Sequence, residues 1–146
     1  MTVRVVIAVA IFVVAGGIAW WLERRRVAAP PTQGRATVPQ QLDRNDFVRP
    51  DAAWLVVLFT SEQCDSCAGL FDKASPLESD DVGVTEIEYG ARPELHRRYQ
   101  IDAAPVTVLA DSAGVTRASF VGAFAAADLW AALADLRSAT ERGENL

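Results

Sequence analysis

Residues 54–67, WLVVLFTSEQCDSC, join an apolar run to two cysteines three positions apart. A continuous apolar run such as 54–59 is typical of a buried central strand. A helix is expected from Cys67 to about Ser75, which would place Cys64 at or near a helix N-terminus. The helix dipole would stabilise a thiolate there, and Cys67 could attack a mixed disulfide formed on Cys64. The sequence therefore predicts Cys64 as the nucleophile and Cys67 as the resolving thiol.

The composition of the 146-residue chain excludes several other kinds of site. Two cysteines are too few for a disulfide scaffold or a four-thiolate zinc site, and one histidine, His96, cannot complete a conventional structural site. We expect His96 on the surface of a short helix, and we expect no metal and no cofactor. The net charge of −5 argues against nucleic acid as a partner, because phosphate binding requires a basic face.

Strand and helix patterns alternate through the rest of the chain. Strands are predicted at 82–89, 106–110 and 115–121, with a hairpin turn at 112–114 between the last two. Helices are predicted at 93–99 and from Ala125 to about Ser138, where leucines recur at helical spacing. This order predicts an α/β domain.

The first 35 residues differ from the rest in composition. Residues 5–22, VVIAVAIFVVAGGIAWWL, carry no charge and as a helix would cover most of a hydrocarbon core of roughly 30 Å. Tryptophans at 20 and 21 and arginines at 24–26 fit a membrane interface. The sequence thus predicts a transmembrane anchor over 1–26, a linker over 27–35, a folded domain over 36–138 and a flexible tail over 139–146. A cleaved signal peptide is the alternative for the first segment.

The charges beside this apolar segment predict its orientation. The arginines at 24–26 outweigh Arg4, so the positive-inside tendency places the folded domain in the cytoplasm, with an extracytoplasmic domain as the alternative. A cytoplasmic domain meets a reducing thiol pool, which favours a protein that reduces its clients.

A second motif lies about forty residues after the cysteines. Together with the strand–CxxC–helix order, residues 99–107, YQIDAAPVT, resemble the thioredoxin family over roughly residues 36–138. The resemblance implies a thioredoxin-like fold, with a central mixed sheet flanked by helices. It further implies a cis Pro105 facing the cysteines, a backbone at Ala104 that binds an extended substrate segment, and Gly122 near the active-site surface.

The chain departs from the family pattern around the cysteines. Gln63 stands where the family commonly has tryptophan, and Asp65-Ser66 replace Gly-Pro. Leu58 stands where a buried acid assists proton transfer to the resolving cysteine, and Glu86 where a lysine often lies. Proton acceptance from Cys67 would then fall to Glu86, Glu62, Asp65 or water. Glu62 and Asp65 also disfavour a thiolate at Cys64, so the net effect on that thiol stays open.

These features predict an enzyme, a thiol-disulfide oxidoreductase acting on protein thiols and disulfides at a membrane surface. The alternative is a non-catalytic thioredoxin-like module that holds a partner in the cis-proline groove or senses redox state. No client, electron donor or oligomeric state follows from the sequence.

Overall fold

The computed structural model describes residue 14 and residues 36–143. From Ala36 onward the chain forms one compact unit. Its elements in order are η1 (Arg44–Asp46), β1 (Trp54–Thr60), η2 (Asp65–Cys67), α2 (Leu70–Ala74), η3 (Ser75–Leu77), β2 (Val82–Glu88), α3 (Pro93–Arg98), β3 (Val106–Ala110), β4 (Thr116–Val121) and α4 (Ala126–Glu141). The predicted linker, and all of the predicted anchor except residue 14, lie outside the described residues.

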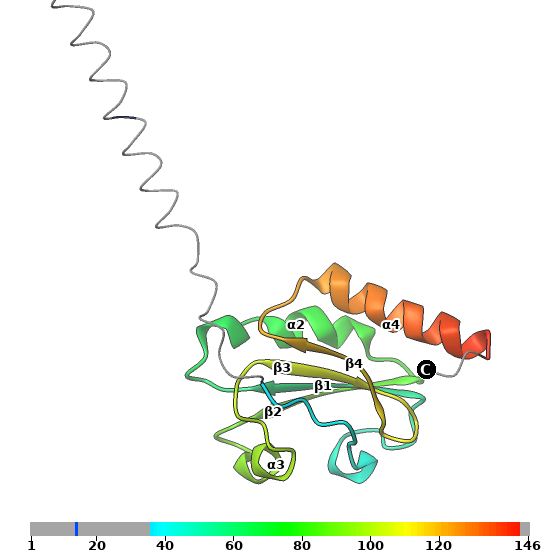
Figure 1. Ribbon diagram of the computed structural model, residues 1–146, viewed down its shortest axis with the longest axis horizontal. Helices are drawn as coiled ribbons and strands as arrows, with labels where there is room; N and C mark the ends of the chain where they lie inside the picture. The colour runs from blue at the N-terminus through cyan, green and yellow to red at the C-terminus, as the bar shows by residue number, and fades with distance from the viewer. Residues whose placement is uncertain (1–13, 15–35, 144–146) are drawn as a thin grey trace, which may run out of the picture. The chain divides into compact units, whose positions relative to one another are not determined.

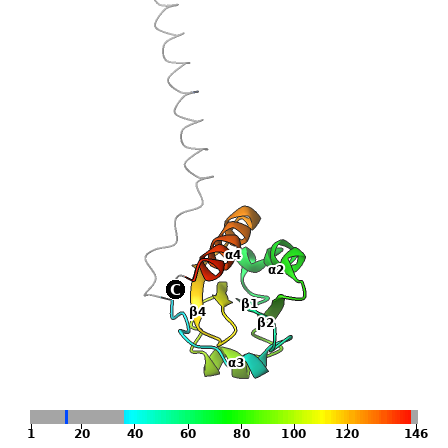
Figure 2. The same ribbon diagram turned by 90° about the vertical axis from the view of Figure 1, so that its right-hand side faces the viewer.

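The four strands form one mixed sheet in the order β2-β1-β3-β4. Strand β1 runs parallel to β2 and antiparallel to β3, and β4 pairs antiparallel with β3. Helices α2 and α4 cover one face and α3 lies on the other (Figures 1 and 2). The predicted central mixed sheet flanked by helices is therefore confirmed.

Strand β1 is buried along its whole length because it supplies both cores of the domain. Val56 and Leu58 face a core shared with α2 and α4, while Val57 and Phe59 face a core shared with α3. A strand covered on both faces needs apolar residues at successive positions. This explains the continuous run that marks β1 in the sequence.

The segment before β1 contains no long helix or strand but is tied into the domain. Leu42 is buried and its N–H donates to the carbonyl of Gly114 at 2.8 Å. The guanidinium of Arg44 donates to main-chain carbonyls of its own segment and to that of Asp111 at 2.9 Å. Residues 36–53 thus belong to the fold.

Two helix boundaries differ from the sequence-based prediction by more than one residue. Helix α4 continues to Glu141, past the expected end at Ser138, because Ala139 is buried against the domain. The predicted helix that begins at Cys67 is wrong in its start, since α2 begins at Leu70.

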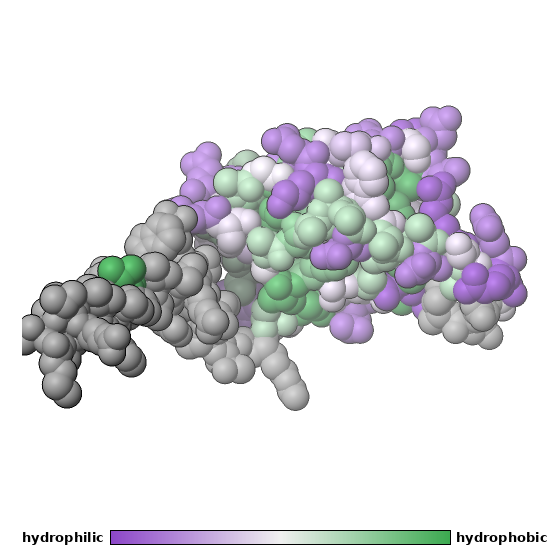
Figure 3. All heavy atoms as spheres, turned by 90° about the horizontal axis from the view of Figure 1, so that it is seen from above, coloured by the Kyte–Doolittle hydropathy of each residue, from purple (hydrophilic) through white to green (hydrophobic). Residues whose placement is uncertain are grey.

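The predicted membrane localisation is contradicted by the described part of the chain. Across residue 14 and residues 36–143, no helix has the length and apolar character needed to cross a membrane. The longest of these helices, α4, has 16 residues, about 24 Å at 1.5 Å per residue, and includes Asp128 and Arg137. Hydrophilic side chains are spread over the face seen from above in Figure 3. The prediction of a single-pass membrane protein with a cytoplasmic domain is therefore corrected. Residues 5–22, on which it rested, lie outside the described residues except for residue 14.

Gly114 is expected to tolerate no side chain. Its φ is +79°, and an added Cβ would stand 2.1 Å from the carbonyl oxygen of Leu42. Gly114→Ala should lower the free energy of unfolding by about 3 kcal/mol, combining left-handed strain with a forced backbone shift. Gly69→Ala is the matched control, since φ is +71° there but the added Cβ meets no atom within 4 Å. It should cost only about 1 kcal/mol in urea unfolding. Equal losses in the two variants would contradict the clash.

Tyr99 should make stability fall at high pH. Its buried hydroxyl donates to the carboxylate of Asp46 and accepts from the N–H of Asp43 at 3.0 Å. Burial, and then the bond to Asp46, raise the pKa of Tyr99 from 10.0 to about 12. A raised folded-state pKa stabilises the fold below pH about 10, and this stabilisation is lost as pH rises toward about 12. In urea unfolding at several pH values, wild type should lose stability through this range more steeply than Tyr99→Phe. Parallel pH profiles would contradict the assignment.

Candidate active site

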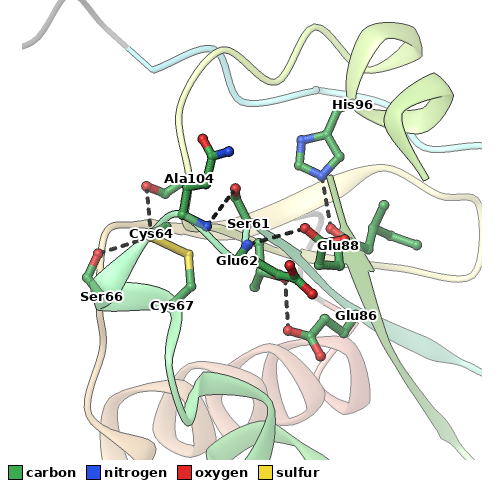
Figure 4. Close-up of a disulfide and its surroundings, with 12 residues drawn as sticks. Ser61, Glu62, Cys64, Ser66, Cys67, Glu86, Glu88, His96 and Ala104 are labelled. Carbon is green, nitrogen blue, oxygen red and sulfur yellow. Dashed lines mark hydrogen bonds between the residues drawn. A yellow bond between two sulfur atoms is a disulfide. The ribbon is translucent and has the colours of Figure 1, made fainter. Parts of the chain in front are cut away.

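The two cysteines lie directly after the end of β1 and form a disulfide, with their Cα atoms 5.4 Å apart (Figure 4). The N–H of Cys64 donates to the carbonyl of Ser61 at 3.0 Å, and the N–H of Cys67 to the carbonyl of Cys64, also at 3.0 Å. Cys67 is the last residue of the short 3₁₀ helix η2. Local backbone bonds therefore hold the pair in a tight turn.

The cysteine turn is not continuous with the α-helix that follows. Ala68 is extended, with ψ of 128°, and Gly69 has a left-handed backbone with φ of +71°. The prediction that Cys64 lies at or near a helix N-terminus holds only for the three-residue 3₁₀ helix η2, of which Cys64 is the N-cap, because the α-helix α2 begins only at Leu70. A single 3₁₀ turn aligns few peptide dipoles, so the expected helix-dipole stabilisation of the Cys64 thiolate loses its basis.

The two cysteine residues differ in exposure. Cys67 is buried, with 7% of its surface exposed, and Cys64 is half-buried. The Sγ of Cys64 lies 3.3 Å from the hydroxyl of Ser66 and 3.5 Å from the carbonyl oxygen of Ala104. In the disulfide neither sulfur has a proton, so Ser66 is the donor; in the dithiol form, the Cys64 thiol can donate to Ala104. An incoming reactant therefore reaches Cys64 before Cys67.

The loop before β3 lies against the cysteine pair, where the resemblance placed it. The Ala104–Pro105 peptide bond is cis. The carbonyl of Pro105 accepts a hydrogen bond from the N–H of Gly122 at 2.8 Å, which brings the end of β4 to the same surface. Gly122 has φ of +92° and open space where a Cβ would project. The structure thus brings together Cys64, Ala104, Pro105 and Gly122; that they bind substrate stays a prediction.

A cavity of about 450 Å³ opens beside both cysteines and has acidic walls. Glu62, Asp72, Glu86 and Glu88 line it together with Cys67. Hydrogen bonds from backbone N–H groups, first that of Gly90 and then those of Ala91 and Glu62, hold the pKa of Glu88 below its usual value. Ionised carboxylates in this cavity disfavour a thiolate at either cysteine.

The three predicted proton acceptors differ in their positions. Glu86 and Glu62 line the cavity with Cys67, whereas Asp65 is exposed and does not line it. The hydroxyl of Thr60 donates to Glu86 at 2.8 Å and orients its carboxylate. Leu58 is fully buried and pairs in register with Glu86 on the neighbouring strand. The carboxylate near Cys67 therefore comes from β2, next to the position where the family has its buried acid.

A second cavity of about 320 Å³ opens on the other side of Cys64. Tyr89, His96, Asp102 and Ala104 are among its lining residues. The expectation that His96 lies on the surface is wrong, because only 3% of its surface is exposed. No motif marked Tyr89, His96 or Asp102 as site residues. They reach Cys64 only through the folding of α3 and its flanking loops against β2, which spacing in the sequence does not reveal.

Comparisons with known proteins place the fold. No protein-family model matches the chain, and no curated protein matches it. Among solved structures, thioredoxin 1 from Thermosipho africanus is similar with a TM-score of 0.53 and 12% identity, over 60% of this chain and 98% of that one. A malaria-parasite thioredoxin-2, described as a component of the protein secretion machinery, has a TM-score of 0.51 and 16% identity, over 57% of this chain and 82% of that one. A mutant thioredoxin from Halobacterium salinarum has a TM-score of 0.50 and 23% identity, over 63% of this chain and 80% of that one. At these identities the comparisons establish a thioredoxin-like fold.

Proposed function

We propose that this protein, whose chain has a thioredoxin-like fold, is a thiol-disulfide oxidoreductase that acts on protein disulfides. The observation that carries the proposal is the Cys64–Cys67 disulfide, whose more exposed sulfur lies 3.5 Å from the carbonyl oxygen of Ala104 beside the cis-proline. An extended client segment lying along this loop would bring its sulfur to Cys64. The buried Cys67 would then meet only a client already attached to Cys64.

The reaction needs two exchange steps. In the reducing direction, the thiolate of Cys64 attacks one sulfur of the client disulfide and expels the other client sulfur as a thiolate. Cys67, as a thiolate, then attacks the Sγ of Cys64 and expels the remaining client sulfur. The client gains two electrons, and the protein ends with the intramolecular disulfide seen in the structure. An external dithiol must return the pair to its reduced form.

The second step requires a base for the Cys67 proton, and we assign this role to Glu86. Its carboxylate lines the same cavity as Cys67 and is oriented by the hydroxyl of Thr60. Glu62 lines this cavity as well, and both glutamates are exposed, but the only hydrogen bond of Glu62 within the described part of the chain is through its backbone N–H, to Glu88 at 3.2 Å. A carboxylate with a fixed orientation is the better-placed acceptor.

Glu86→Gln is expected to slow release of the client from Cys64 by about tenfold, because an amide accepts no proton. Rapid acid quenching, followed by alkylation and mass spectrometry, would measure the decay of the mixed disulfide. Asp65→Asn is the control, since this carboxylate is outside the cavity, and its decay rate should match wild type within about twofold. Equal rates in all three proteins would rule out Glu86 as the acceptor and leave Glu62 or water.

The redox midpoint of the full-length protein tests the proposed function. The disulfide would be titrated in thiol buffers and read by alkylation, with Cys64→Ser as control. One reversible two-electron couple is expected. A midpoint near about −270 mV would indicate a reductant and one near about −120 mV an oxidant. Absence of a reversible couple would favour the alternative, a partner-binding module. The feature that supports this alternative is the apolar Leu58, which stands where the family has its buried acid.

A further inference from the structure

One ring nitrogen of His96 is fixed as a hydrogen-bond donor. Its Nε2 lies 2.9 Å from the backbone carbonyl oxygen of Ile87. A carbonyl oxygen can only accept a hydrogen bond, so Nε2 must carry the proton. The ring is further held edge-on against Phe59 and Tyr89, with centroid distances of 5.4 and 5.2 Å. In its uncharged form, His96 therefore presents Nδ1 as a fixed acceptor.

This acceptor nitrogen faces the cavity next to Cys64. In Figure 4 the ring nitrogen of His96 that makes no hydrogen bond lies on the side of the ring toward Cys64 and Ala104. His96 lines the cavity, and among the described residues the only hydrogen bond of its ring is the one through Nε2. A buried side chain thus offers an unpaired acceptor to whatever enters.

The other walls of this cavity favour a donor with positive charge. The carboxylate of Asp102 lies at the cavity and, within residues 36–143, accepts only from Thr37, at 3.0 Å from its N–H. The ring of Tyr89, 51% exposed, offers an aromatic surface of the kind that attracts cations. No lysine or arginine is among the described residues that line the cavity. An acidic client side chain would meet the carboxylate of Asp102 with no cationic side chain to pair with it, and an apolar one would leave Nδ1 unpaired.

We propose that the cavity bounded by Cys64, Ala104, Tyr89, His96 and Asp102 binds a lysine or arginine side chain that flanks the reacting cysteine of the client. The cavity adjoins the reacting sulfur, because Cys64 and Ala104 both line it. The Sγ of Cys64 lies 3.5 Å from the carbonyl oxygen of Ala104. A neighbouring side chain of a docked client is therefore the group that enters. This inference rests on the proposed function and specifies its substrate class.

Disulfide-linked peptide dimers test the preference directly. Three dimers would have their cysteine flanked on both sides by lysine, glutamine or glutamate. Their reduction by stoichiometric, pre-reduced full-length protein would be followed by chromatography at about pH 8, and each rate divided by that for dithiothreitol. We expect the lysine dimer to react about five- to tenfold faster than the glutamine dimer, with the glutamate dimer slowest. The lysine preference should persist in about 0.5 M salt, which screens long-range attraction to the acidic protein.

Two variants locate the source of the preference. His96→Phe removes Nδ1 while keeping a ring between Phe59 and Tyr89, and Asp102→Asn removes the charge without touching the ring. Each should reduce the lysine-to-glutamine rate ratio by about threefold or more, and Asp102→Asn tests the cavity even if His96→Phe does not fold. Glu78→Gln removes an exposed charge outside both cavities and should leave the ratio unchanged.

The possible outcomes distinguish the proposed substrate preference from the oxidoreductase function on which it rests. If wild type reduces all three dimers at one relative rate, the substrate preference is overturned and the oxidoreductase stands. A preference that survives both His96→Phe and Asp102→Asn, or that disappears in salt, overturns the cavity as its source. Failure to reduce any dimer overturns the oxidoreductase and the preference together.

Discussion

Replacing Cys64 with serine is expected to lower the rate of client-disulfide reduction by about a thousandfold or more, because a serine hydroxyl forms no disulfide and is a far weaker nucleophile. The structure makes this cysteine the point of attack, since it is the less buried of the pair and faces Ala104 and the cis-proline. Reduction of a peptide disulfide, recycled by dithiothreitol and corrected for its background, gives the measurement.

Cys67→Ser is the matched control for this loss. It keeps the attacking thiol but removes the resolving one, so a mixed disulfide between Cys64 and the client should accumulate and be visible by mass spectrometry. Turnover should fall in both variants, yet only Cys67→Ser should trap the client. Trapping by Cys64→Ser instead would reverse the two roles, and full activity in Cys64→Ser would remove the enzyme proposal.

Arg44→Met is expected to lower the free energy of unfolding by about 3 to 5 kcal/mol. Arg44 is 9% exposed, and its guanidinium donates to the carbonyls of Pro50 at 3.1 Å and Asp111 at 2.9 Å, and also to that of Ala52. Methionine fills part of the volume but leaves these acceptors without a donor, and each buried unsatisfied carbonyl costs about 1 to 3 kcal/mol. Urea unfolding followed by tryptophan fluorescence measures the change.

Arg137→Met gives the comparison for Arg44→Met. Arg137 is exposed on α4 and lies 3.5 Å from Asp81, an ion pair that water screens on both sides. Its loss should change the free energy of unfolding by less than about 1 kcal/mol. If Arg44→Met costs no more than Arg137→Met, the carbonyl cluster has no stabilising role.

The sheet could be predicted because its strands carry strong local patterns. Strand β3 has the predicted bounds, Val106–Ala110. Strand β1 is one residue longer than the predicted run and ends at Thr60. Burial on both faces makes a central strand almost wholly apolar, with Thr60 in β1 and Thr107 in β3 as the polar exceptions, so its sequence identifies it without knowledge of its neighbours. The cis bond before Pro105 was expected from resemblance, not from the pattern of apolar residues.

The active-site details could not be predicted because they depend on contacts between distant residues. The late start of α2 follows from the left-handed backbone of Gly69. The sequence alone does not show which backbone conformation a glycine in a helical pattern adopts. His96 lies in a basic, polar stretch but packs between Phe59 and Tyr89 from other parts of the chain. Glu86 lines the same cavity as Cys67 only because β2 pairs in parallel with β1.

The break at Ala68 and Gly69 also bears on how the molecule fluctuates. The cysteine turn and α2 are separate backbone units, joined where Gly69 leaves the helical conformation. Opening of the disulfide can therefore loosen the turn without unwinding α2, whose Leu70 and Ala74 stay packed in the core. Amide protection against hydrogen exchange would drop around the cysteines alone, while β1 kept the slow exchange of the global fold. If the proposed function holds, a turn that loosens independently of α2 would let the cysteines fit clients of different shape at little cost to the rest of the domain.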